Sequence, residues 1–125
     1  MIARLAQSGL MHVLFAFVMM GSWAAYANWG HPMPKPLIAG VLQGALSGAI
    51  TFALKRSLDY LRGHVARAFG WWLPPVIALS ISFCLLVAAH LAAGTPEVAR
   101  TISLPFSVAS LYALSYNFLM WRRRP

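Results

Sequence analysis

Four long apolar runs, separated by short polar segments, make up most of this chain. They cover about residues 9–29, 37–56, 71–93 and 98–121. Because about 20 apolar residues in a helix cross the hydrocarbon core of a bilayer, each run predicts one transmembrane helix. We therefore expect an all-α integral membrane protein in which residues 1–125 form one domain of four transmembrane helices, arranged as two hairpins.

The segments between these runs predict where the helices end. Residues 30–36, GHPMPKP, contain three prolines, whose missing amide donors and fixed φ angles favour a short, stiff loop. Gly94, Thr95 and Pro96 make a tight connection, which predicts that the third and fourth helices run antiparallel. Residues 57–70 fit an amphipathic interfacial helix, an extension of the second helix or a solvated basic loop.

Composition agrees with a membrane protein. Hydrophobic residues are 60% of the chain, against roughly 45–50% in soluble domains. Ten lysines and arginines stand against two acids, which gives a net charge of +8. These cations lie between apolar runs rather than on a soluble basic face. We therefore interpret them as topology signals and as contacts for anionic membrane lipid, and we expect no nucleic acid partner.

The distribution of the cations predicts the orientation of the chain. With the N-terminus inside, the cytoplasmic side receives eight of the ten: Arg4, Lys55, Arg56, Arg62, Arg67, Arg122, Arg123 and Arg124. Lys35 and Arg100 remain on the outer side. The positive-inside rule therefore predicts that both termini face the cytosol, in a bacterial-type cytoplasmic membrane.

The first apolar run also has features of a secretory signal peptide. Arg4 gives a weak basic region before the run, and Ala25, Tyr26 and Ala27 form an A-x-A-like cleavage site. The run is longer than the usual signal-peptide core of about 7–15 residues, so we expect a retained helix. Cleavage would leave the orientation of the other three helices unchanged.

Groups that could carry catalysis or bind a metal are sparse. Asp59 and Glu97 are expected in loops on opposite faces of the membrane, where they cannot act together, so we expect no enzymatic activity. Cys84 is the single cysteine, and the histidines lack the spacing of metal ligands: His12, His31, His64 and His90. We therefore expect no metal and no cofactor. We interpret His12 and His90 as polar residues at headgroup level or at helix ends.

Residues 40–56, GVLQGALSGAITFALKR, carry two sets of residues at a four-residue spacing. The first set, the glycine stripe, consists of Gly40, Gly44 and Gly48. The second set, the polar track, consists of Gln43, Ser47 and Thr51 and ends at Lys55. On a helix these two sets lie side by side. The glycine stripe predicts close helix packing. Gln43 is expected to face the bundle interior or a wet cavity, because an amide in hydrocarbon needs hydrogen-bond partners.

The fourth apolar run ends in a similar way. Its polar residues fall on a similar face: Ser103, Ser107, Ser110 and Asn117. Asn117 and Arg122 predict a polar corner at the inner surface, which matches the corner that Thr51, Lys55 and Arg56 predict on the second helix. Lysine and arginine at such a position suit a phosphate or pyrophosphate headgroup. The alternative is anchoring of these cations to anionic phospholipid.

These helix ends resemble those of the GtrA-like family of small four-helix membrane proteins. The resemblance rests on chain length, on the two-hairpin layout and on the segments FALKRSLDY at 52–60 and SYNFLMWRRR at 115–124. It implies movement of a polyprenyl-phosphate-linked sugar across the cytoplasmic membrane, for cell-envelope polysaccharide synthesis. It also implies two similar halves, residues 1–56 and 71–124.

The working hypothesis is therefore the flipping of such a lipid carrier. The phosphate would be held at the inner mouth by Lys55, Arg56 and Arg122. The polar headgroup would be sheltered in transit by Gln43, Ser47, Thr51 and Asn117. Because the chain is small, we expect a homo-oligomer or a membrane-protein partner. The alternative is an accessory or assembly subunit that docks through the glycine stripe and transports nothing. A small channel is a third hypothesis, weakened by the lack of a charged ring within the predicted helices.

Overall fold

The order of the helices follows the four apolar runs. The computed structural model describes the backbone of residues 2–123 and the side chains of residues 9–123. The helices are α1 (Ile2–Ala27), α2 (Lys35–His64), α3 (Leu73–Ala93) and α4 (Val98–Arg123), and a short 3₁₀ helix, η1 (Arg67–Phe69), follows α2. Each of the four α-helices is long and apolar enough to cross a membrane. The predicted all-α fold is confirmed. Arg4 and Arg124, two of the predicted cytoplasmic cations, lie outside the described side chains.

The second helix is longer than its apolar run. α2 continues through 30 residues to His64 and ends where Val65 adopts an extended conformation. Of the three alternatives for residues 57–70, the extension of the second helix is therefore correct as far as His64. Asp59, which we expected in a loop, lies inside α2, where it pairs with Lys55 one turn before it and Arg62 one turn after it. Such i,i+3 and i,i+4 pairs stabilise a helix.

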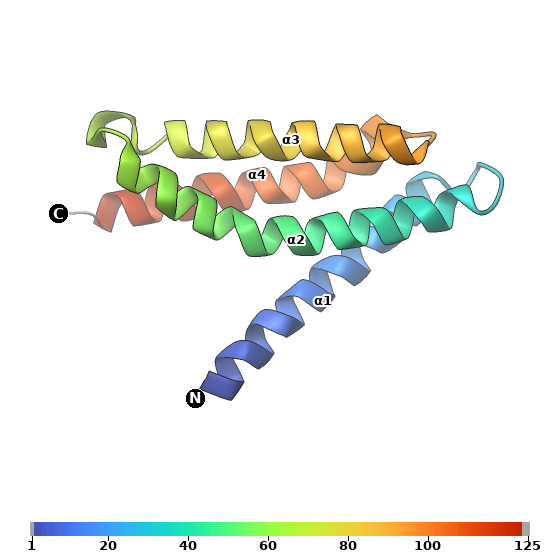
Figure 1. Ribbon diagram of the computed structural model, residues 1–125, viewed down its shortest axis with the longest axis horizontal. Helices are drawn as coiled ribbons and strands as arrows, with labels where there is room; N and C mark the ends of the chain where they lie inside the picture. The colour runs from blue at the N-terminus through green and yellow to red at the C-terminus, as the bar shows by residue number, and fades with distance from the viewer. Residues whose placement is uncertain (1, 124–125) are drawn as a thin grey trace.

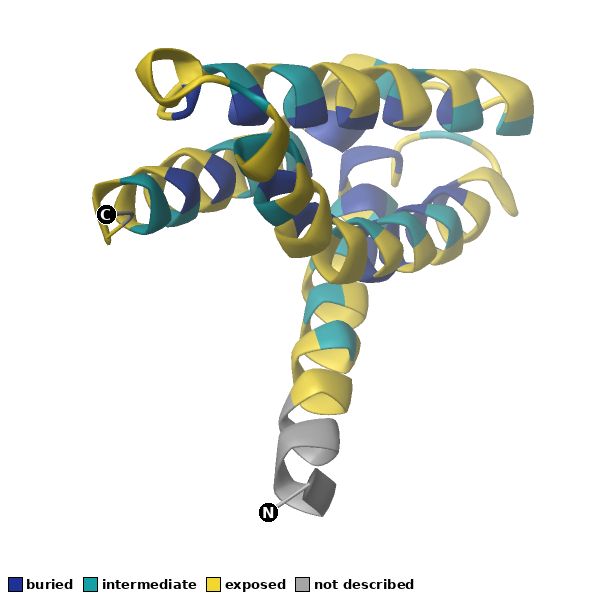
Figure 2. Ribbon diagram, turned by 60° about the vertical axis from the view of Figure 1, so that its left-hand side comes forward, coloured by how far each residue is buried: buried dark blue, intermediate teal, exposed yellow. Residues whose placement is uncertain are grey.

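Consecutive helices run in opposite directions, and α2, α3 and α4 lie side by side (Figure 1). One end of the bundle, the loop end, holds residues 28–34 and 94–97. The other end, the cationic end, holds Lys55, Arg56, Arg62, Arg67, Arg122 and Arg123. α1 meets the other helices toward the loop end and diverges from them toward its N-terminus (Figure 1). Residues 9–19 of α1 are therefore mostly exposed (Figure 2).

The glycine stripe lies against α1 of the same chain. A Cβ atom on Gly40 would approach the Gly21 carbonyl oxygen to 3.0 Å, and one on Gly44 would approach the Phe17 carbonyl oxygen to 2.9 Å. Gly48 continues the contact toward Val13. Backbones can approach this closely only where side chains are absent. The stripe therefore joins α2 to α1 rather than to α4.

A small apolar core joins the other three helices. Its buried members are Leu54 and Leu58 of α2, Ala78 of α3 and Ala113 of α4. Most large apolar side chains point outward instead, as Phe15, Val41 and Leu111 do. In a soluble protein these exposed side chains would be costly, whereas in a bilayer they contact lipid tails.

Candidate functional site

A cavity of about 240 Å³ lies at the centre of the bundle, and all four helices contribute to its walls. Most of its lining is apolar. The polar side chains that line it come from every helix: His12 of α1, Gln43, Ser47 and Thr51 of α2, Ser82 of α3 and Tyr112 of α4. The polar track of the second helix therefore borders a partly open cavity, and Gln43 faces the interior of the bundle, as the sequence predicts.

Gln43 is fully buried and is held by two neighbours. Its Nε2 atom donates to Ser47 Oγ at 2.8 Å, and its Oε1 atom lies 2.8 Å from His90 Nε2. Since the amide oxygen can only accept, His90 Nε2 carries the proton, and His90 Nδ1 accepts from the Thr95 hydroxyl at 2.8 Å. These bonds join α2 to α3 and to the turn at the loop end.

Of our two interpretations of His90, the position at a helix end is correct, since His90 lies in the last turn of α3 and bonds to Thr95 just after it, whereas exposure at headgroup level is wrong. Its side chain is completely inaccessible to solvent. The physical reason is Gln43, which places a polar amide at the α2–α3 contact and needs a donor there. His12 differs, because its side chain is exposed and lies at the wall of the cavity.

Replacing Gln43 with leucine should destabilise the bundle by about 1–2 kcal/mol, because His90 then loses its acceptor inside the membrane. Unfolding in increasing mole fractions of dodecyl sulfate, followed by circular dichroism, measures this loss. The double variant Gln43→Leu with His90→Leu should cost less than the sum of the two single variants. Simple additivity would show that the two side chains do not interact.

From the cavity, polar and aromatic side chains continue toward the cationic end. Thr51 is exposed and borders the cavity, and Lys55 follows it one turn later on α2. On α4, the Tyr112 ring stacks on the Tyr116 ring with 5.6 Å between centroids. The Lys55 ammonium lies 5.5 Å from the centre of the Tyr116 ring. The α2–α4 contact thus leads from the cavity to a cation.

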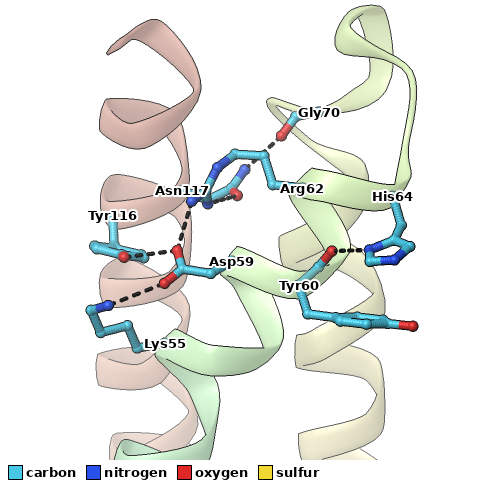
Figure 3. Close-up of polar contacts among 8 residues, drawn as sticks. All are labelled: Lys55, Asp59, Tyr60, Arg62, His64, Gly70, Tyr116 and Asn117. Carbon is cyan, nitrogen blue, oxygen red and sulfur yellow. Dashed lines mark hydrogen bonds and ion pairs between the residues drawn. The ribbon is translucent and has the colours of Figure 1, made fainter. Parts of the chain in front are cut away.

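At the cationic end, Asp59 is the centre of a polar cluster that connects α2 to α4 (Figure 3). Its carboxylate accepts from Lys55 Nζ at 3.1 Å, from Arg62 Nη2 at 2.6 Å and from the Tyr116 hydroxyl at 2.8 Å. Arg62 also donates to Asn117 Oδ1 at 3.0 Å. Asp59 therefore balances part of the positive charge of this end.

Asn117 is fully buried, and its amide group connects three segments of the chain. Besides accepting from Arg62, it donates to the carbonyl oxygens of Gly70 at 2.8 Å and Trp71 at 3.2 Å, which precede α3. The polar corner that we predicted between Asn117 and Arg122 is therefore wrong. Arg122 lies five residues further along α4 and is exposed; at about 100° per residue it points about 140° away from Asn117.

Lys55 and Arg56, which we predicted to hold the same phosphate, do not lie together. Lys55 faces Tyr116 of α4, whereas the guanidinium of Arg56 lies 4.9 Å from the centre of the Phe52 ring on the lipid-exposed side of α2. Neighbouring helical residues point about 100° apart, so the side chains of Lys55 and Arg56 lie on different surfaces of α2.

The three serines that we predicted on one face of α4 do not form a polar track with Asn117. Each donates to a backbone carbonyl of its own helix: Ser103 to Arg100, Ser107 to Ser103 and Ser110 to Phe106. Their hydrogen bonds are satisfied locally.

A polar cluster at the loop end has no counterpart among our predictions. Asn28 is fully buried, and its Nδ2 atom donates to Thr101 Oγ1 at 2.7 Å. Its Oδ1 atom accepts from the backbone amide of Glu97 at 3.0 Å, just before α4 begins. An asparagine directly after an apolar run is a sequence signal for such a role, since its amide can satisfy the free backbone groups of nearby helix ends.

Among the described residues, no three His, Cys, Asp or Glu side chains gather into a group that could hold a metal ion. Asp59 and Glu97 lie at opposite ends of the bundle: Asp59 bonds to Tyr116, and Glu97 Oε1 lies 3.1 Å from His31 Nε2. Features that could bind a ligand include the cavity, its extension toward Lys55 and the cationic surface.

Comparison with protein-family models, with curated proteins and with solved structures gives no match for this chain. The resemblance to the GtrA-like family therefore stays a prediction from sequence.

Proposed function

We propose that this protein moves the polar headgroup of a lipid carrier, a polyprenyl-phosphate-linked sugar or a related lipid, across the cytoplasmic membrane. The observation that carries the proposal is the central cavity, whose walls are mostly apolar and whose polar edge leads along α2 and α4 to Lys55. In this proposal the cationic end faces the cytosol, as the distribution of arginine and lysine favours.

Each part of the cavity suits one part of such a lipid. The apolar walls suit the hydrocarbon chain, and the hydroxyls of Thr51, Ser82 and Tyr112 can exchange hydrogen bonds with a sugar. Lys55, exposed at the cationic end, would attract the phosphate as it enters. Gln43 holds the cavity wall in place through its bonds to Ser47 and His90.

The size of the cavity implies movement of α1. A volume of about 240 Å³ lies below the roughly 300–1,000 Å³ of most small-molecule sites. α1 supplies one wall and diverges from the other helices toward its N-terminus (Figure 1). An outward displacement of α1 would therefore admit a headgroup without disturbing the core that joins α2, α3 and α4.

The test is a substitution on α1 that fills the cavity with a larger side chain. Ala16 lines the cavity, so Ala16→Phe should lower the transfer rate at least tenfold in vesicles that contain the purified protein and a polyprenyl-phosphate-linked hexose. Oxidation of the exposed sugar by an impermeant diol-cleaving reagent reports arrival at the outer leaflet. Ala88→Phe is the matched control, because Ala88 is exposed on α3 and away from the cavity. Equal rates for the wild type, Ala16→Phe and protein-free vesicles would refute the proposal.

The accessory-subunit hypothesis required the glycine stripe to be accessible to a partner protein. The glycine stripe that was expected to dock a partner is covered by Phe17 and Gly21 of α1. A non-transporting subunit would therefore need a different docking surface.

A further inference from the structure

A second hollow, separate from the central cavity, lies on the face between α2 and α3. It is an open groove of about 510 Å³. Its apolar walls include Ala49 and Ala53 on α2 and Ile77, Ile81 and Leu85 on α3. The small alanine side chains leave space beside the larger side chains of α3. The result is a groove along the two helices that is open to the surrounding lipid.

The groove becomes polar at the cationic end of the bundle. Arg56, Ser57 and Tyr60 line it there, one after another on the same side of α2. Figure 3 shows the Tyr60 ring directed away from Lys55 and from α4. Ile50 and Leu54 line both the groove and the central cavity, so they lie between the two spaces.

Among the described residues, no carboxylate pairs with Arg56. Asp59 accepts from Lys55 and Arg62, and Glu97 is at the loop end beside His31. These are the only two acids of the chain. The Arg56 side chain is exposed and lies over the Phe52 ring, which borders hydrocarbon. A groove for a hydrocarbon chain therefore ends at a cation that pairs with neither of the two acidic side chains.

We propose that this groove binds one anionic phospholipid from the leaflet that borders the cationic end. One acyl chain lies along the groove between α2 and α3, and the phosphate pairs with the Arg56 guanidinium. The hydroxyls of Ser57 and Tyr60 are placed to donate to headgroup oxygens. Charge complementarity selects an anionic headgroup over a zwitterionic one. The proposal does not depend on transport through the central cavity.

Native mass spectrometry of the detergent-solubilised protein, titrated with phosphatidylglycerol or with phosphatidylcholine of the same chains, tests the proposal. Phosphatidylglycerol should occupy one preferred site. One cation near the membrane surface contributes about 1 kcal/mol to anionic-lipid binding, so Arg56→Gln should weaken that binding about fivefold. Arg123→Gln removes an equal charge from an exposed position of the same end and should change the affinity by less than twofold.

The position of the chain is tested separately. Ala53→Phe, which fills the groove, should weaken the binding of both lipids. Phosphatidylglycerol with a photoreactive acyl chain should label residues 49–61 and 77–85 of the wild type. Equal losses for Arg56→Gln and Arg123→Gln would show a diffuse cationic surface and overturn the proposal, as would labelling confined to other segments. Because Ala16 lines the central cavity and not the groove, Ala16→Phe should leave phosphatidylglycerol binding unchanged, so either proposal can fail without the other.

Discussion

Replacing Asn117 with leucine is expected to lower the free energy of unfolding by about 2–3 kcal/mol, since three hydrogen bonds are lost and no water can reach the buried site. Arg62 would lose its acceptor on α4, and the carbonyl oxygens of Gly70 and Trp71 would lose their donor. The same substitution would weaken the attachment of the segment before α3 to α4, which would then depend on the Trp121 indole bonded to the Arg67 carbonyl oxygen. This site therefore affects both stability and the arrangement of the cationic end.

Unfolding in dodecyl sulfate gives the energy, and the intrinsic fluorescence of Trp71 and its neighbours reports the local change. Ser115→Leu is the matched control, because Ser115 is exposed on the same helix, two residues away. It should leave the unfolding midpoint within about 0.5 kcal/mol of the wild type. An Asn117→Leu protein as stable as Ser115→Leu would contradict the hydrogen-bonding role of Asn117.

Replacing Gly21 with leucine is expected to cost about 3 kcal/mol, at the upper end of the usual range for overpacking. A Cβ atom at Gly21 would lie 2.8 Å from the Gly40 carbonyl oxygen and 3.5 Å from the Gly44 Cα. Both neighbours are backbone atoms, so relief requires that α1 and α2 separate rather than that a side chain rotates. The rest of the leucine side chain enlarges this separation.

Gly9 provides the control on the same helix. A Cβ atom there would meet nothing within 4 Å, so Gly9→Leu should be neutral or should stabilise α1 by up to about 1 kcal/mol through its higher helix propensity. A spin-label distance between α1 and α2 should increase in Gly21→Leu and stay unchanged in Gly9→Leu. Equal unfolding midpoints for the two variants would show that the close approach of α1 and α2 contributes little.

The four helices were predictable because long apolar runs have few alternatives in a chain of this composition. The extension of α2 to His64 was harder to predict, because Gly63 and the mixed charges of residues 57–70 also suit a loop. The spacing of Lys55, Asp59 and Arg62 was the available signal, since these residues support a helix by pairing along one side of it.

The candidate site was predicted only in part. Gln43, Ser47 and Thr51 share a cavity because all three lie on one helix, whose periodicity the sequence shows directly. Contacts between helices could not be predicted in this way. The bonds of Gln43 to His90 and of Asn117 to Arg62 depend on the rotation of each helix against its neighbour, and a four-residue spacing within one helix does not determine that rotation.

α1 contacts α2 from Val13 to its C-terminal end and diverges from the other helices toward its N-terminus, which has a mechanical consequence. Toward the loop end it is held by the Trp23 indole bonded to the Arg100 carbonyl oxygen, by Asn28 and by the close approach of Gly21 to Gly40. A helix of 26 residues is about 39 Å long at 1.5 Å per residue. A rotation of about 10° about Asn28 would therefore displace the opposite end of α1 by about 7 Å, while the contacts of Trp23 and Gly21, about 8 and 10 Å from Asn28, would shift by about 1–2 Å. Because α1 is long, a small change in its packing at the loop end would produce a much larger displacement of its other end, toward the cationic end of the bundle.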